Sequence, residues 1–279
     1  MTNTPPYAKS LQMLTFTKMN GAGNDFVLVD NRDGKLQLDA KTIESLCDRH
    51  RGVGADGLLM VEKAANGADF RMRYYNSDGG EADMCGNGAR CFARFANRLS
   101  SPRTEVTFET PAGVITAEFL GELVRLDMSE PKDLRLNDTI TVENAPLTVH
   151  SVNTGVPHAI VFVEDLDKVD VQRMGAAIRY HTHFAPKGSN VNFVKILNEN
   201  TVAIRTYERG VEGETLACGT GVVASALITH ELKGASSPVG IRVKGGDLLH
   251  VGFEKSAAGY SNVTLKGPAD FVFDGQIKL

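Results

Sequence analysis

Short segments with strand-like apolar and polar patterns fill most of the chain, which is typical of half-buried β-strands. The strand candidates are FTKM, DFVLVD, GLLMVE, DFRMRYYN, EVTFET, VITAEFL, AIVFVE, SNVNFVKIL, TVAIRTYE, IRVKG, LLHVGFE and SNVTLKG. Only four segments have helical spacing instead, at about residues 40–50, 87–99, 170–180 and 219–233. Many strands and few helices favour the α+β class.

The second helical segment shows the spacing most clearly. Its apolar residues Phe92, Phe95, Ala96 and Leu99 recur at i, i+3, i+4 and i+7, which places them on one face of a helix. We expect this helix to be buried inside a curved or barrel-like mixed sheet.

The chain repeats itself at a long interval. The segment RMRYYNSDGGEADMCGNG (71–88) is similar to AIRTYERGVEGETLACGTG (203–221), and NGAGNDFVLVD (20–30) is echoed by NTGVPHAIVFVED (153–165). The two pairs keep the same order at an offset of 132 or 133 residues. This period is far longer than that of a solenoid and predicts two similar domains.

We place the N-terminal domain at residues 14–127 and the C-terminal domain at residues 128–267. Residues 268–279 are a candidate addition to the N-terminal domain. The boundary falls within the charged segment RLDMSEPKDLRLNDTI, which contains Pro131.

Composition excludes several classes of protein. The 279 residues are 42% hydrophobic and carry a net charge of -4 without a long run of one sign, which argues against a nucleic-acid partner. Residues 1–13 are polar, contain prolines and lack the apolar core of a secretory signal, so we expect a frayed start. No apolar run reaches the roughly 20 residues of a membrane span. We expect a soluble, cytoplasmic protein with no membrane contact.

The chain has four cysteines, Cys47, Cys85, Cys91 and Cys218. They form no C-x-x-C pair, and the histidines complete no zinc spacing, so we expect neither a metal site nor structural disulfides. Cys47 and Cys91 fit the apolar faces of two expected helices and are interpreted as small buried side chains.

Cys85 and Cys218 each begin a Cys-Gly-x-Gly turn just before an expected helix. The glycines allow the backbone to approach a ligand closely. The positive end of the helix can bind a carboxylate and favours a thiolate. We therefore expect an acidified thiol beside a carboxylate site in each half of the chain.

If the two halves face each other across a cleft, one thiolate can remove an α-proton while the other thiol protonates the opposite face. The result is inversion at that carbon. A lone cysteine at a helix start is more often structural, but two in matched frames favour catalysis. A redox pair is an alternative, although such pairs usually show C-x-x-C.

Three long motifs carry a resemblance to a known family. KMNGAGNDF, YNSDGGEADMCGNGARCFARF and TYERGVEGETLACGTGVVAS are similar to the signatures of the diaminopimelate epimerases, and the similarity runs from about Phe16 to the end. It implies cofactor-independent interconversion of L,L- and meso-diaminopimelate, a precursor of lysine and peptidoglycan. It also implies two similar domains around a cleft, each with a central helix, and commonly a homodimer.

The resemblance assigns roles to individual residues. Cys85 and Cys218 match the acid–base pair, and His158 and Glu208 match residues that assist thiol ionisation. The residues that match substrate-binding positions are Asn24, Asn76, Gly86, Asn87, Asn190, Glu208, Arg209, Gly219 and Thr220. Two positions depart from the family pattern: Gly57 stands where some members have a glutamine, and Val156 stands where many have an asparagine. These changes put fine specificity in doubt rather than the chemistry.

Other interpretations of the same residues remain open. The three asparagines could be turn residues, His158 could be a structural histidine, and the Glu208–Arg209 pair could be a solvated surface pair. A proline or hydroxyproline racemase-like isomerase would also use two cysteines, but its substrate has one amino-acid head. A non-catalytic amino-acid-binding relative would not need both thiols. No signature of a pyridoxal phosphate enzyme is found.

Overall fold

The structure is a computed structural model that describes residues 13–82 and 84–279. Its four α-helices are α1 (Ala40–Cys47), α2 (Gly86–Arg98), α3 (Val171–Arg179) and α4 (Gly219–Lys233), with 3₁₀ turns η1 (Leu166–Lys168) and η2 (Thr182–Phe184). The strands of the first half are β1 (Met13–Gly21), β2 (Asn24–Asp30), β3 (Gly57–Glu62), β4 (Phe70–Asn76), β5 (Glu81–Ala82), β6 (Glu105–Thr110), β7 (Gly113–Leu120) and β8 (Leu123–Asp127). Those that follow are β9 (Lys132–Val142), β10 (Ala145–Asn153), β11 (Pro157–Phe162), β12 (Asn190–Asn198), β13 (Thr201–Glu208), β14 (Gly213–Thr215), β15 (Val239–Arg242), β16 (Leu248–Ser256), β17 (Gly259–Pro268) and β18 (Asp270–Lys278).

Both halves of the chain use the same order of strand pairings, which confirms the duplication predicted from the sequence. In the first half, β1 pairs antiparallel with β2, β2 pairs parallel with β3 across α1, and β3 pairs antiparallel with β4. A second parallel pair, β4 with β6, is connected by α2, and β6, β7 and β8 follow as an antiparallel meander. Strands β10 to β17 repeat this series around α3 and α4.

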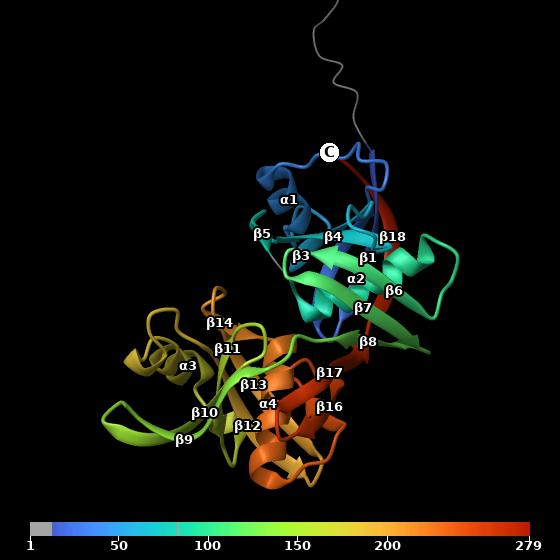
Figure 1. The fold of residues 1–279 in the computed structure, drawn as a ribbon. Coiled ribbons are helices and arrows are strands. Elements are labelled where there is room, and N and C mark those ends of the chain that lie inside the picture. The colour runs from blue at the N-terminus through green and yellow to red at the C-terminus, as the bar shows by residue number, and fades with distance from the viewer. Residues whose placement is uncertain (1–12, 83) are drawn as a thin grey trace, which may run out of the picture.

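One strand of the first half comes from the far end of the chain. β18 pairs antiparallel with β1, whereas the equivalent edge of the second half is filled by β9, which pairs with β10. β8 pairs with β17 and joins the two halves into one continuous sheet. Figure 1 shows β18 running back beside β1, far from the rest of the C-terminal half. This pairing favours assigning the C-terminal tail to the N-terminal domain, and the boundary between residues 127 and 128 stays a prediction.

Each half wraps its sheet around one central helix. Phe92, Phe95 and Ala96 of α2 are buried against β1–β4 and β6–β8, as their spacing predicted. α4 is buried in the same way in the second half. α1 and α3 cover the outer faces of the two sheets with separate apolar clusters. Burying a side chain of this size stabilises the fold by roughly 1.5–3 kcal/mol, so the central helices are held rigidly. The α+β prediction is confirmed.

All four predicted helices are present within a few residues of the expected bounds. The strand prediction missed β5, β8, β9, β10, β14 and β18. The boundary segment was expected to be a linker, but it contains the start of β9. β9 has apolar residues at alternate positions, Leu134, Leu136, Ile140 and Val142, but Asp138 interrupts the series and the first eight residues are largely exposed, so the charged residues between them favoured a linker.

The expectation of a frayed start concerns residues 1–13. Met13 instead begins β1, opposite Lys278 of β18, and the other twelve residues lie outside the described part of the chain. Among the described residues, no helix is long and apolar enough to cross a membrane.

Candidate active site

The N-terminal ends of the two central helices meet between the halves of the molecule. Cys85 is the N-cap residue of α2, and Cys218 is the N-cap residue of α4. A Cβ atom added to Gly219 would lie 3.3 Å from the Cα atom of Gly86, so the two backbones are in contact just after the thiols. Two positive helix ends therefore converge on one place.

A cleft of about 680 Å³ opens at this contact. Its lining includes both thiols, together with Asn24, Phe26, Asp56, Tyr74, Asn76, Ser77, Asp78, Ala82, Met84, Gly86, Glu208, Arg209, Gly210, Val211, Glu214, Thr215, Leu216, Ala217, Gly219 and Thr220. A second hollow of about 590 Å³ lies over β8, β16 and β17 and contains neither thiol. The first cleft is the one that brings the candidate chemistry together.

The two thiols differ from the expected acidified state. Burial raises the pKa of Cys85, while the backbone N–H groups of Gly88 and Asn87 at the helix start pull it down only in part. Burial likewise raises the pKa of Cys218, and the negative charge of Glu208 adds to the effect. The expectation of an acidified thiol in the free protein is wrong, because the cost of desolvating a thiolate exceeds the gain from the helix end. A ligand must supply the remaining stabilisation.

The N-terminal wall of the cleft contains a chain of oriented amides. Arg90, which is fully buried, donates from Nη2 to Oδ1 of Asn87 at 2.9 Å. Asn87 in turn donates from Nδ2 to Oδ1 of Asn24 at 2.7 Å and to the carbonyl oxygen of Ala217 at 3.2 Å. Asn24 donates to Oδ2 of Asp56 at 2.9 Å. Every amide in the chain therefore has a fixed orientation, and Asn87 lies behind the cleft surface rather than on it.

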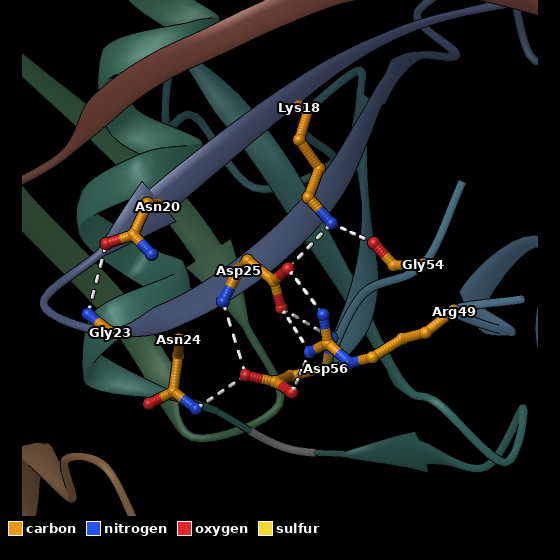
Figure 2. A network of polar contacts seen from close by, with 8 residues as sticks. All are labelled: Lys18, Asn20, Gly23, Asn24, Asp25, Arg49, Gly54 and Asp56. Carbon is orange, nitrogen blue, oxygen red and sulfur yellow. Dashed lines mark hydrogen bonds and ion pairs between the residues drawn. The ribbon is translucent and has the colours of Figure 1, made fainter. Parts of the chain in front are cut away.

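A cluster of charges, shown in Figure 2, holds the end of this amide chain. Arg49 donates to both oxygens of Asp25, at 2.7 and 2.9 Å, and to Oδ1 of Asp56 at 2.7 Å. The buried Lys18 lies 2.8 Å from Asp25 and also bonds the carbonyl oxygen of Gly54. Asp56 is thus an oriented acceptor for Asn24, and the orientation comes from α1 and the loop after it.

Asp25 should make the fold sensitive to acid. Burial alone would raise the pKa of this carboxyl, but the hydrogen bonds and charges of Arg49 and Lys18 outweigh it and lower the pKa from 3.8 to about 2. Its stabilising contribution is present above the unfolded pKa and is lost as the pH falls from 3.8 to about 2. We expect the stability difference between the wild type and Asp25→Asn to shrink by about 1–2 kcal/mol over that range, allowing for solvent screening. Urea unfolding at several pH values measures it.

The exposed Asp33 provides the control for this measurement, because its partner Lys35 is itself exposed. Asp33→Asn should leave the free energy of unfolding nearly unchanged at every pH. A difference between the wild type and Asp25→Asn that stays constant across the acid range would contradict the assignment.

The C-terminal wall of the cleft carries the carboxyl group of Glu208. Burial raises the pKa of Glu208, which ends β13, while the hydroxyl of Thr215 donates to it at 2.9 Å and lowers the pKa in part. Arg209 follows Glu208 in the lining of the cleft. Within the described ranges, the Arg209 guanidinium has no carboxylate within 4 Å. A free cation of this kind is suited to binding a substrate carboxylate.

Three residues expected at the site lie behind the lining or at its edge. Asn190 is buried, donates to the carbonyl oxygen of Pro157 at 3.3 Å and accepts from the backbone N–H of Arg209 at 2.7 Å. His158 is fully buried and bonds Thr220 and Asn192. Asn76 is exposed and lines the cleft. Asn190 therefore positions Arg209 in this structure, and a direct substrate contact by Asn190 stays a prediction.

The two departures from the family pattern have different surroundings. A Cβ atom at Gly57 would lie 2.5 Å from the carbonyl oxygen of Tyr75 and 2.7 Å from the ring of Tyr74, so this backbone leaves no room for a glutamine. Val156 is partly buried and does not belong to the described lining of the cleft. Asp56, the neighbour of Gly57, is the polar group that reaches the cleft at this place.

Several polar residues at or behind the site were not predicted from the sequence, among them Asp56, Thr215 and Asn192. Asn192 lies two positions after Asn190 in β12, and a strand places such residues on the same face. That spacing was the available signal. Asp56 bonds Asn24, 32 residues earlier, and Thr215 bonds Glu208 from the neighbouring strand β14; neither residue carries a comparable local pattern.

Comparison with known proteins matches the whole chain to one family. The family model described as diaminopimelate epimerase matches residues 16–133 and 150–272. A diaminopimelate epimerase from Aquifex aeolicus is 43% identical over 277 residues, covering 95% of this chain and 98% of the relative. Another from Chlorobaculum tepidum is 44% identical over 265 residues, covering 94% of this chain and 100% of the relative.

Solved structures of more distant proteins share the fold. A Bacillus anthracis phenazine biosynthesis protein of the PhzF family has a TM-score of 0.71 at 15% identity, covering 96% of this chain and 99% of that one. A hydroxyproline epimerase from Agrobacterium vitis has a TM-score of 0.69 at 18% identity, covering 96% and 93%. These similarities show the fold alone. The family model and the close relatives show more: the chain belongs to the diaminopimelate epimerase family.

Proposed function

We propose that this chain epimerises L,L-diaminopimelate to meso-diaminopimelate without a cofactor, with Cys85 and Cys218 as the two proton carriers. The supporting observation is the meeting of two thiol-capped helix ends in one cleft. Each half of a duplicated fold contributes one thiol, which suits a reaction that is chemically symmetric at the α-carbon. The product is a precursor of lysine and peptidoglycan.

The proposed reaction moves one proton on and one proton off the same carbon. A thiolate on one wall takes the α-proton and becomes a thiol, while the C–H electron pair passes into the substrate carboxylate. The thiol on the other wall then donates its proton to the opposite face and becomes a thiolate. The helix ends beginning at Gly86 and Gly219 stabilise the negative charge that builds up on the carboxylate. The roles of the two thiols are exchanged after each turnover.

Glu208 is the group proposed to set the protonation of this pair. Its negative charge raises the pKa of both Cys85 and Cys218, and burial favours its own neutral form. Because burial raises the pKa of Glu208, its ionised form is a stronger base than an exposed carboxylate and can take a proton from one of the two thiols when the substrate binds. The thiolate that starts the reaction would form in this way.

The variant Glu208→Gln should be more stable than the wild type but much less active. Because the folded pKa of Glu208 lies above its unfolded value, ionisation opposes folding as the pH rises above the unfolded pKa. We expect the neutral glutamine to raise the free energy of unfolding at neutral pH and to lower kcat by at least about 100-fold. Urea unfolding and the rate of epimerisation measure the two effects. The exposed Glu199 supplies a control, Glu199→Gln, which should change neither; an active Glu208→Gln would contradict the assigned role.

The lining of the cleft favours a substrate with two polar ends. Beyond the thiols it presents Arg209, Asn24, Asn76 and Asp78, which can bind a second ammonium and carboxylate group. A proline or hydroxyproline racemase-like isomerase would use the same pair of thiols on a substrate with one head. The distant structures share only the fold with this chain and do not favour that alternative.

Incubation in D₂O without added cofactor tests the proposed function. L,L-diaminopimelate should yield the meso isomer with deuterium at the α-carbon, whereas L-proline should exchange no deuterium. Exchange into proline alone would establish the racemase-like alternative. Binding of diaminopimelate without exchange or isomerisation would identify a non-catalytic amino-acid-binding relative.

A homodimer and a cytoplasmic location complete the proposal. All four thiols are free, which suits a reducing compartment.

Apolar side chains on β1 and β18 are exposed, including Met13 and Val272, and such a patch marks an interaction surface. Light scattering should give twice the mass of 30.1 kDa, and Val272→Glu should lower it. Val114→Glu, at an exposed valine of β7, is the control, and a wild-type monomer at micromolar concentration would contradict the dimer.

A further inference from the structure

The side chain of Asn192 is fully buried and can take only one orientation. Its Nδ2 atom lies 3.3 Å from the carbonyl oxygen of Ala159, and its Oδ1 atom lies 2.9 Å from the hydroxyl of Thr206. A carbonyl oxygen can only accept, so the amide nitrogen must face Ala159. Exchanging the two ends of the amide would place two acceptors against each other.

This orientation determines the tautomer of His158. The same Nδ2 atom of Asn192 lies 3.0 Å from Nδ1 of the ring. Because an amide nitrogen only donates, Nδ1 must be the unprotonated nitrogen. A neutral imidazole carries its proton on the other nitrogen, so Nε2 carries the hydrogen. The ring is enclosed in the second half of the molecule and has no exposed surface.

The donor-to-acceptor direction of these hydrogen bonds continues from His158 through Thr220 to the thiol of Cys218. Nε2 of His158 lies 2.9 Å from Oγ1 of Thr220 and donates to it. The Thr220 hydroxyl then has its own hydrogen free, and Oγ1 lies 3.5 Å from Sγ of Cys218. The hydroxyl can therefore donate to the sulfur once the thiol has lost its proton, and such a donor stabilises the thiolate more than the thiol.

We propose that Asn192 is a positioning residue that fixes the tautomer of His158 and so makes the Thr220 hydroxyl a permanent donor to Cys218. The proposal rests on the proposed function for its consequence in catalysis, because Cys218 must become a thiolate in one direction of the reaction. It assigns His158 the role of a neutral hydrogen-bond donor rather than that of a base that removes the thiol proton.

Two further observations support this arrangement. Burial, with a smaller contribution from the charge of Arg209, lowers the pKa of His158 to about 3, so the ring stays neutral in the working range of the enzyme. A Cβ atom on Gly221 would lie only 2.4 Å from Oδ1 of Asn192. The amide is therefore pressed against the first turn of α4, and the glycine after Thr220 is needed for it to fit.

The first test reads the tautomer directly. Nitrogen NMR of the full-length protein labelled with ¹⁵N-histidine distinguishes a protonated ring nitrogen from an unprotonated one. The chain has seven histidines, and His158 is assigned as the signal that disappears in His158→Gln. We expect a neutral ring with the proton on Nε2. A proton on Nδ1, or on both nitrogens at neutral pH, would overturn the proposal, and neither reading depends on which substrate the enzyme uses.

The second test changes Asn192 itself. A carboxylate at this position accepts from Nδ1, so Asn192→Asp should move the ring proton to Nδ1 and turn the Thr220 hydroxyl away from the sulfur. An unchanged Nε2 proton in the folded variant would show that Asn192 does not set the tautomer. Where the buried carboxylate prevents folding, Thr220→Val tests the last step, because it removes the hydroxyl with little change in shape.

The third test measures the reactivity of Cys218. In a Cys85→Ser background without substrate, the rate of iodoacetamide alkylation at Cys218, followed by peptide mass, reports its thiolate fraction. Thr220→Val and Asn192→Asp should each lower this rate by about tenfold or more, because a hydrogen bond to a charged sulfur is lost. The matched control is Ser225→Ala, which removes a buried hydroxyl of α4 that bonds only to Gly221 O. A wild-type rate in Thr220→Val, or an equal loss in Ser225→Ala, would overturn the relay.

Discussion

Replacing either Cys85 or Cys218 with alanine should lower the rate of epimerisation by at least about 10³-fold, since each thiol supplies one of the two proton transfers. In the described lining of the cleft each wall contributes a single thiol, because α2 and α4 approach from opposite halves of the molecule. The loss should therefore be similar for the two variants and should not increase much in the double variant. The conversion of L,L- to meso-diaminopimelate, followed by chiral chromatography, measures it.

The structural effect of these substitutions should be small. Cys218 is buried but faces the cleft, and Cys85 is only half-buried, so alanine leaves no closed cavity. Cys47→Ala is the matched control: this thiol belongs to the last residue of α1, lies in the outer apolar cluster away from the cleft, and its loss should leave turnover unchanged. Full turnover in Cys85→Ala or Cys218→Ala would refute a mechanism with two proton carriers.

The sequence was informative where the chemistry is local. The Cys-Gly-x-Gly turn, the helix after it and their repetition all lie within short segments, so the two thiols at helix N-caps could be predicted from spacing. Their protonation could not be predicted, because it depends on how much water the opposite half of the molecule excludes. For the same reason, the sequence could not show that Asn190 and His158 lie behind the cleft surface.

In the fold too, features set by local sequence could be predicted and features set by distant partners could not. α2 and α4 were predictable because a central helix is apolar along a continuous face. Residues 268–279 were a candidate addition to the N-terminal domain, but the strand β18 and its pairing with β1 were not predicted, because no local pattern reports a partner about 250 residues away. The match between β9 and β18, each filling the same edge of its own half, becomes visible only when the pairings are known.

Arg90 is expected to have the largest effect of any residue that does not touch the substrate. It is fully buried and donates to Asn87 Oδ1, to Pro268 O at 3.0 Å and to Gly86 O at 3.3 Å. In the described part of the chain it has no carboxylate within 4 Å, so three carbonyl-type acceptors from both halves hold its charge. Arg90 thus ties the start of α2 to the end of β17 and orients the amide of Asn87, behind the proposed carboxylate site.

Arg90→Met should lower kcat/KM by about 100-fold, because Asn87 loses the hydrogen bond that orients its amide toward Asn24 and toward Ala217, just before α4. It should also lower the free energy of unfolding by about 2 kcal/mol, since the orphaned acceptors cost more than the relief of removing a buried charge. Arg90→Lys should restore little, because a single ammonium cannot reach all three acceptors. Urea unfolding and epimerisation kinetics measure both effects.

Arg94, one turn further along α2, provides the control for this prediction. It also bonds to the segment after β17, with a distance of 3.4 Å to Ala269 O, and pairs with the exposed Glu122. Its side-chain hydrogen bonds within the described residues go to Glu122 and Ala269, and none goes to Asn87 or Gly86. Arg94→Met should therefore cost some stability and leave kcat/KM within about twofold, since losses confined to a surface pair are small. If Arg94→Met and Arg90→Met reduced kcat/KM equally, a general loosening of the two halves would explain both, and the specific role of Arg90 in orienting Asn87 would be refuted.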